Sequence, residues 1–157
     1  MSATATNADV FKEAFYQAIT ADFAGDPETE TVLVTFGAPG TYVPNDIVSF
    51  LDLSADQDTA TLGTNRGRDE TIELTVSISC VVPGGQEAEL LAHQRAYGLL
   101  RRIEYYARKT DTTIGGTVRW CFLIRHGSSG QTDPTLIERG RVTEIVAMFR
   151  AVARVTN

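Results

Sequence analysis

The stretch from Thr71 to Val82 reads TIELTVSISCVV and decides the fold of the 157-residue chain. Its apolar residues recur at every second position, as in a β-strand with one buried face. These residues are Ile72, Leu74, Val76, Ile78, Cys80 and Val82. A register slip of one residue would bury Glu73 and expose Ile78. The pattern therefore predicts a strand that sets the register of its sheet.

A long helix is predicted after this strand, because Pro83, Gly84 and Gly85 interrupt the alternation. From there to about Lys109 the apolar residues follow the helical period. They are Ala92, Ala96, Leu99, Ile103 and Tyr106. Acidic residues begin this segment and basic residues end it, which complements the helix dipole. We expect the helix to pack on the sheet.

Two more strands are predicted toward the end of the chain. Residues 117–124 alternate, but both sets contain apolar side chains, which favours a central strand covered on both faces. Residues 126–140 are polar and rich in glycine, as in a long interaction loop. The run 141–156 alternates again and predicts a long final strand with one apolar face. That face carries Thr143, Ile145, Ala147, Phe149, Ala151, Ala153 and Val155.

Upstream of Thr71, the spacing of apolar residues predicts a helix over residues 7–23, begun by a capping box of Thr6 and Asp9. Short β-branched runs at 31–36 and 47–53 predict strands. Residues 54–70 are polar and read either as a long loop or as an extended hairpin arm. Together the elements predict one α+β domain over residues 1–157. Its mixed or antiparallel sheet is flanked by an N-terminal helix and one long central helix.

Composition narrows the possible functions. The formal charge of −6 disfavours tight binding to DNA phosphates. Residues 1–7 lack the features of a signal peptide, and no apolar run is long enough for a membrane helix, so we expect a soluble protein. Cys80 and Cys121 lie in strand-like runs, which predicts buried free thiols and a reducing compartment such as a bacterial cytoplasm.

The parts needed for catalysis are scarce. His93 and His126 have no second ligand at metal spacing, and the glycine-rich segments 63–67 and 127–130 lack the lysine of a phosphate loop. We therefore predict no catalytic residue, cofactor or metal, and expect an interaction protein. An enzyme or ligand-binding domain is the alternative, and it would require a pocket with converging polar groups.

The candidate interface consists of charged residues in and beside the two polar segments, since long polar loops commonly carry interactions. Arg66 and Arg68 stand beside acidic residues, and could form either intersubunit salt bridges or a solvated turn. The candidates are Asp56, Asp58, Arg66, Arg68, Asp69, Glu70, Arg125, His126, Asp133, Glu138, Arg139 and Arg141.

Four phrases of the sequence carry a resemblance to a known family. They are RGRDET at 66–71, VPGG at 82–85, GTVRW at 116–120 and GRVTEI at 140–145. In their order and spacing, over about residues 30–156, the chain resembles the tail terminator proteins of long-tailed actinobacterial phages, also called minor tail or tail-completion proteins. Its loop 126–141 departs from the family because it is poor in acidic residues and contains arginines.

The resemblance implies a structural virion protein that forms a hexameric ring like the lambda-type terminators. Such a ring would cap the tail tube at its head-proximal end, stop its polymerisation and attach the head-tail connector. The implied partners are other copies of the chain, the tail tube protein and neck proteins. Genomic DNA would pass through the lumen without specific binding. The ring would be assembled in the host cytoplasm and end in the virion neck. Another neck or head-completion protein is the alternative within this class.

Overall fold

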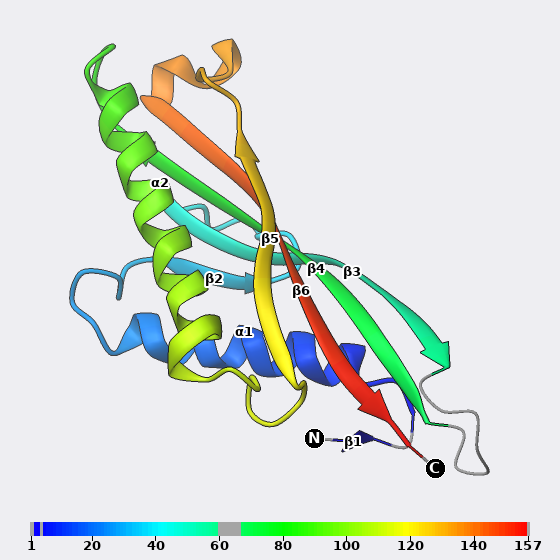
Figure 1. Cartoon of the computed structure of the whole chain (residues 1–157). Coiled ribbons are helices and arrows are strands. Elements are labelled where there is room, and N and C mark those ends of the chain that lie inside the picture. Colours follow the sequence, from blue (N-terminus) through cyan, green and yellow to red (C-terminus); the bar gives the residue numbers. More distant parts are fainter. Residues whose placement is uncertain (1, 4, 60–66, 157) are drawn as a thin grey trace.

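The structure is a computed structural model that describes residues 2–3, 5–59 and 67–156. These residues form an α+β fold, which confirms the predicted class (Figure 1). The strands are β1 (Ser2–Ala3), β2 (Leu33–Phe36), β3 (Asp46–Thr59), β4 (Arg68–Val82), β5 (Trp120–Ser128) and β6 (Arg141–Val155). The helices are α1 (Ala8–Ala24) and α2 (Ala88–Tyr105), with a π-helical turn at Tyr106–Thr110 and a 3-10 helix at Pro134–Arg139.

The strands form one six-stranded sheet in the order β1-β6-β4-β3-β2, and β5 also pairs with β6. β4 runs antiparallel to both β3 and β6, whereas the pairs β1–β6 and β2–β3 are parallel. The mixed sheet is thus as predicted. The long ladder between β4 and β6 joins Arg68 with Val155 at one end and Val82 with Arg141 at the other.

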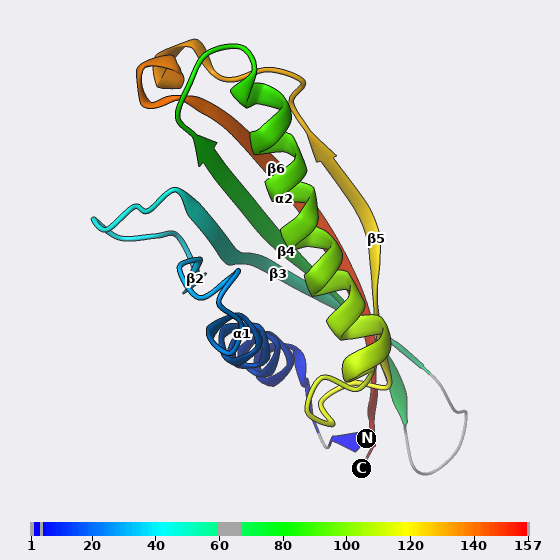
Figure 2. The same cartoon turned by 90° about the vertical axis from the view of Figure 1, so that its left-hand side faces the viewer.

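Both α-helices pack on the same face of this sheet, as Figure 2 shows. The apolar face of β4 and the apolar face of β6 are buried there, together with one stripe of each helix. Phe15 of α1 lies at the centre, with its ring 5.3 Å from Phe149 and 5.4 Å from Phe50. Ile103 of α2 joins the same cluster. The predicted alternation of β4 and β6 therefore corresponds to one continuous core.

Neither α1 nor α2 covers the other face of the sheet, which we call the open face. It carries the second set of side chains on each strand, including Glu73 and Thr75 of β4 and Val146 and Arg150 of β6. Most of these side chains are half-buried or exposed. The fold thus has two layers, with one face of the sheet available to partners.

β5 is an edge strand, so its predicted central position is wrong. Among the described residues it pairs with β6 alone. Cys121 points into the core, whereas Phe122 and Ile124 are 47% and 40% exposed. Apolar side chains on both faces of this strand therefore mean an uncovered apolar surface in the isolated subunit.

The polar segments differ in how far they form regular structure. β3 extends to Thr59 and β4 begins at Arg68, so the described part of 54–70 is a hairpin arm rather than a loop. Residues 60–66 lie outside the described part. In the predicted loop 126–140, β5 continues to Ser128 and a 3-10 helix occupies Pro134–Arg139.

Helix α1 has the predicted bounds to within one residue, but its start is capped differently. The backbone N–H of Asn7 donates to Glu70 of β4 at 2.7 Å, in place of the predicted capping box with Asp9. The two cysteines are free and buried, as the alternation of their strands predicts.

Candidate assembly interface

The structure divides the predicted interface residues between opposite ends of the sheet. The arm end carries Asp56, Asp58, Arg68, Asp69 and Glu70, and the loop end carries Asp133, Glu138, Arg139 and Arg141. Arg125 and His126 lie between them on β5, and Arg66 falls outside the described residues. β6 connects the two ends over 15 residues, about 45–50 Å at the rise of a strand. The candidates therefore form two separate surfaces.

At the arm end, exposed aspartates extend along β3. Asp56 pairs in register with Thr71, and Asp58 with Asp69. Asp69 is neutralised by Arg154 at 3.0 Å and lies 3.9 Å from Arg119. No ion pair reaches Asp56 or Asp58 from any described residue. Their charges are therefore available to a partner.

Glu70 lies inside the subunit, with an exposed fraction of 1%. Its carboxylate accepts hydrogen bonds from Asn7 N at 2.7 Å, Thr6 Oγ1 at 2.5 Å and Gln57 Nε2 at 2.9 Å. The first two donors belong to the start of α1 and the third to β3. Glu70 thus fixes α1 to the base of the arm and is not a surface residue of the subunit.

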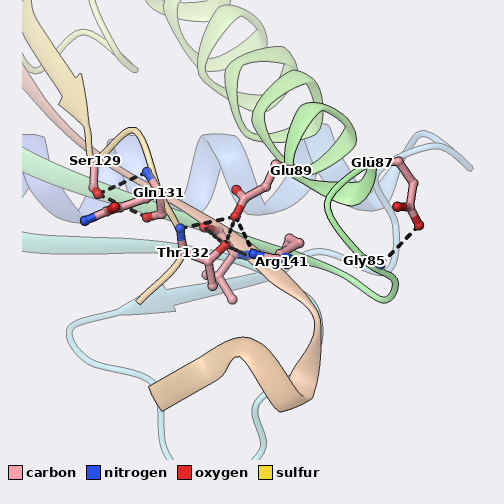
Figure 3. Close-up of polar contacts among 8 residues, drawn as sticks. Gly85, Glu87, Glu89, Ser129, Gln131, Thr132 and Arg141 are labelled. Atoms are coloured by element: carbon pink, nitrogen blue, oxygen red, sulfur yellow. Dashed lines mark hydrogen bonds and ion pairs between the residues drawn. The ribbon is translucent and has the colours of Figure 1, made fainter. Parts of the chain in front are cut away.

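At the loop end, Glu89 in the first turn of α2 holds the segment before β6 (Figure 3). Its Oε1 accepts from Thr132 Oγ1 at 2.6 Å, from Thr132 N at 3.3 Å and from Arg141 at 3.3 Å. The hydrogen bonds from Thr132, followed by Arg141, lower the pKa of Glu89 below its ordinary value of 4.5. Thr132 also accepts from Val142 N at 3.0 Å. The loop is therefore attached both to α2 and to β6.

Two of the resembling phrases meet at this end. Gly140 has a φ of +126°, and a Cβ there would lie 2.5 Å from the carbonyl oxygen of Val82. Only glycine combines this φ with this close approach. Gly140 therefore lets GRVTEI begin β6 directly against VPGG, where β4 ends.

The 3-10 helix presents its charges outward. Asp133 caps it by accepting from Thr135 N and Thr135 Oγ1, both at 2.9 Å, and these hydrogen bonds lower the pKa of Asp133. Glu138 and Arg139 are exposed. Asp133 thus has a structural role, whereas Glu138 and Arg139 remain available for contacts.

A groove of about 340 Å³ lies on the open face beside the 3-10 helix. It runs between the 38–44 segment, the strands β3, β4 and β6, and Leu136 of the 3-10 helix. The apolar lining includes Pro39, Val43, Pro44, Ile47, Leu136 and Val142. Among the described residues that line it, Arg139 and Glu144 are the charged ones. This composition suits apolar side chains of a protein partner better than acid-base chemistry.

The edge strand β5 carries exposed residues of two kinds. Phe122 stacks with Trp120 at 5.2 Å between ring centroids and faces solvent on its other side. Arg125 is exposed, and its side chain donates a hydrogen bond to Met148 Sδ at 3.7 Å. His126 lies 3.3 Å from the hydroxyl of Tyr97 on α2. The predicted interface residues do not include Trp120 and Phe122. The apolar side chains on both faces of their strand were the sequence feature that could have indicated an interface there.

Groups that could carry other chemistry are few in the described part of the chain. Burial raises the pKa of each cysteine, Cys80 and Cys121, to about 12, which keeps both thiols protonated and poorly nucleophilic. Residues 2–3, 5–59 and 67–156 contain no cluster of three His, Cys, Asp or Glu side chains able to hold a metal ion. No helix in these ranges has the length and apolarity to cross a membrane.

Comparison with known proteins gives a match at the level of the fold. No protein-family model and no curated protein matches the sequence. Among solved structures, the chain is similar to a chain in the virion of a native gene transfer agent particle, with a TM-score of 0.51 and 14% sequence identity. The match covers 93% of this chain and 94% of the other. At this identity the likeness establishes a shared fold along almost the whole length.

Proposed function

We propose that the protein is a structural subunit of a phage virion, and specifically a tail terminator that forms a hexameric ring. The observation that carries the proposal is the end-to-end match of its fold with a virion chain. The four phrases that resemble tail terminators support it, and the structure brings two of them into contact at Gly140 and Val82.

The separation of the two ends of the sheet supports the capping role. In a ring whose axis runs roughly along the strands, all arm ends lie on one side and all loop ends on the other. The arm end presents the hairpin of β3 and β4, whereas the loop end presents the 3-10 helix and the apolar groove. Because the two faces of the ring differ in chemistry, one face can bind the tube while the other has no binding site for a further tube subunit.

Such a ring stops polymerisation without catalysis. Tube growth is a head-to-tail association that does not close along its axis, so it ends when a ring with an incompatible upper face binds. Each subunit can contribute a weak contact, because the closed ring presents all of them at high effective concentration. The upper face would then accept the head-tail connector, in the virion neck.

The charge of the protein fits the passage of DNA. The formal charge of −6 favours repulsion of phosphates over adhesion. We therefore propose a lumen through which the genome slides without specific binding. Assembly in the host cytoplasm is compatible with two reduced, buried cysteines.

The proposal can be tested with a phage that carries an early stop codon in this gene. Electron micrographs of the lysate should show heads without tails, together with tubes of abnormal length, and added purified protein should restore joining. Finished free tails of normal length would instead indicate a head-completion role. Normal tails joined to full heads would exclude both roles.

A further inference from the structure

Among the described strands, β5 and the second half of β3 each have a free backbone edge. On one side, β5 pairs with β6 and with no other described strand. On the other side, β2 covers β3 only from Ile47 to Phe50, so the outer edge of residues 51–59 has no described strand beside it. Unpaired strand edges are templates for pairing with another chain.

These two edges carry opposite charges. Exposed Asp52, Asp56 and Asp58 lie on the β3 edge, and none has an ion pair with a described residue. Arg125 is exposed on β5 and forms no ion pair with a described residue, and His126 follows it. The arginines within the β6 ladder, in contrast, are neutralised inside the subunit, as in the pair of Arg150 with Glu73 at 2.7 Å.

The register places the two edges at the same level of the sheet. Trp120 of β5 pairs with Val152 of β6, which pairs with Thr71 of β4. Thr71 in turn pairs with Asp56 of β3, so Trp120 and Asp56 lie level with each other. The charges also share a face, because the register partners of Arg125 and Asp56 are Met148 and Thr71, which lie on the open face.

Strand direction permits the two edges to join. β5 runs antiparallel to β6, β6 to β4, and β4 to β3, so β5 and β3 have opposite directions in one subunit. A rotation about an axis along the strands preserves these directions. In a ring built by such a rotation, the β3 of one copy would run antiparallel to the β5 of its neighbour and continue the alternation of the sheet.

We infer that β5 of one copy pairs with residues 51–59 of β3 in a second copy of this chain. The contact is head-to-tail, since it uses two different edges, and repetition of such a contact gives a ring when the rotation closes. It would bring Arg125 beside the aspartates and cover Phe122 and Ile124, which are 47% and 40% exposed in one subunit. This inference deepens the proposed ring, but the pairing itself does not depend on a role in tail assembly.

Charge reversal tests the pairing in the purified full-length protein. Wild-type protein should self-associate in sedimentation velocity, and Arg125→Glu should weaken association roughly tenfold or more because attraction becomes repulsion. The double variant Asp52→Arg, Asp56→Arg should weaken it similarly. Lys109→Glu and the pair Glu28→Arg, Glu30→Arg make matched charge changes at exposed residues that belong to neither strand, and should leave association unchanged.

Mixing the two defective proteins gives the decisive result. In Arg125→Glu both edges are negative, and in Asp52→Arg, Asp56→Arg both are positive, so neither variant should associate alone. In a mixture, each contact between the two variants joins a negative edge to a positive one. An equimolar mixture should therefore recover association, with the two variants present in equal amounts by native mass spectrometry. Circular dichroism should show that both variants are folded.

Hydrogen exchange locates the contact independently of charge. In the wild-type assembly, amides in 120–128 and 51–59 should exchange more slowly than in Arg125→Glu at equal concentration. A monomeric wild-type protein at its solubility limit, a mixture that fails to associate, or protection confined to other segments would each overturn the pairing. If pairing holds but the stop-codon phage makes normal joined tails, the terminator role fails and the edge contact stands.

Discussion

Replacement of Glu70 by alanine should destabilise the subunit more than removal of any exposed carboxylate of β4. Glu70 is 1% exposed and accepts three hydrogen bonds, two of them from the start of α1. Its loss leaves the N–H of Asn7 without its acceptor and detaches α1 from the arm.

The loss of stability expected for Glu70→Ala follows from the surroundings of the three hydrogen-bond donors. A hydrogen bond to a charged group contributes about 1.5–3 kcal/mol to stability, and a donor left without an acceptor costs its desolvation. The side chains of Thr6 and Gln57 belong to exposed residues and can turn to water, so the contributions do not add in full. We expect Glu70→Ala to lower the free energy of unfolding by about 2–4 kcal/mol. For a chain of this size that corresponds to a fall in Tm of roughly 5–15 °C.

Glu73→Ala is the matched control, because this substitution also removes a carboxylate from β4. Its partner Arg150 is at 2.7 Å, but the two side chains are 31% and 42% exposed. A pair screened by solvent contributes about 0.2–1 kcal/mol.

Urea denaturation followed by circular dichroism should give a lower midpoint for Glu70→Ala than for Glu73→Ala. Both variants should be measured at one low protein concentration, because any association adds apparent stability. Equal midpoints for Glu70→Ala and Glu73→Ala would refute the assignment of Glu70 as the link between α1 and the arm.

The remaining predictions concern the core, the thiols and the loop end. Ile78→Asp should abolish folding, because it buries an unpaired carboxylate. Arg68→Ala should leave the thermal melt almost unchanged. Equal loss of stability in the two variants would contradict the assignment of Ile78 to the core. Cys80 and Cys121 should resist thiol reagents at pH 8 in the folded protein, and unfolding without reductant should expose two reactive groups. The pKa of Glu89 is lowered in the folded state, so its contribution to stability is present above about pH 4.5 and lost as the pH falls through the lowered value. Denaturation between pH 3 and 6 should therefore show a weaker acid dependence for Glu89→Gln, and an unchanged dependence would argue against the network of Figure 3.

The strands that span the core could be predicted because their period is local. Each buried side chain of β4 from Ile72 to Cys80 lies two positions from the next, so burial on one face appears directly in the sequence. The same holds for β6 from Thr143 to Val155. The position of β5 could not be predicted this way, because apolar side chains on both faces are compatible with a central strand or with an edge that a partner covers.

The candidate interface could be predicted less well, since charge alone does not show which contacts a residue makes. Glu70 and Asp69 are adjacent in sequence, yet one is buried beneath α1 and the other is half-exposed beside Arg154. Glu89 reaches partners 43 and 52 positions away, and no local pattern indicates such distances. Asp56 and Asp58 could be predicted as candidates because they lie in a polar segment of the sequence. Both side chains are exposed in the structure.

The order of the strands has a consequence for synthesis. β6 follows all other strands in the chain, yet it lies between β4 and β5 in the sheet. While the ribosome still holds β6, β5 has no strand to pair with and the core lacks Phe149. We therefore expect that a nascent subunit can use the outer edge of β5 for the proposed contact only after β6 has left the ribosome and paired with β5.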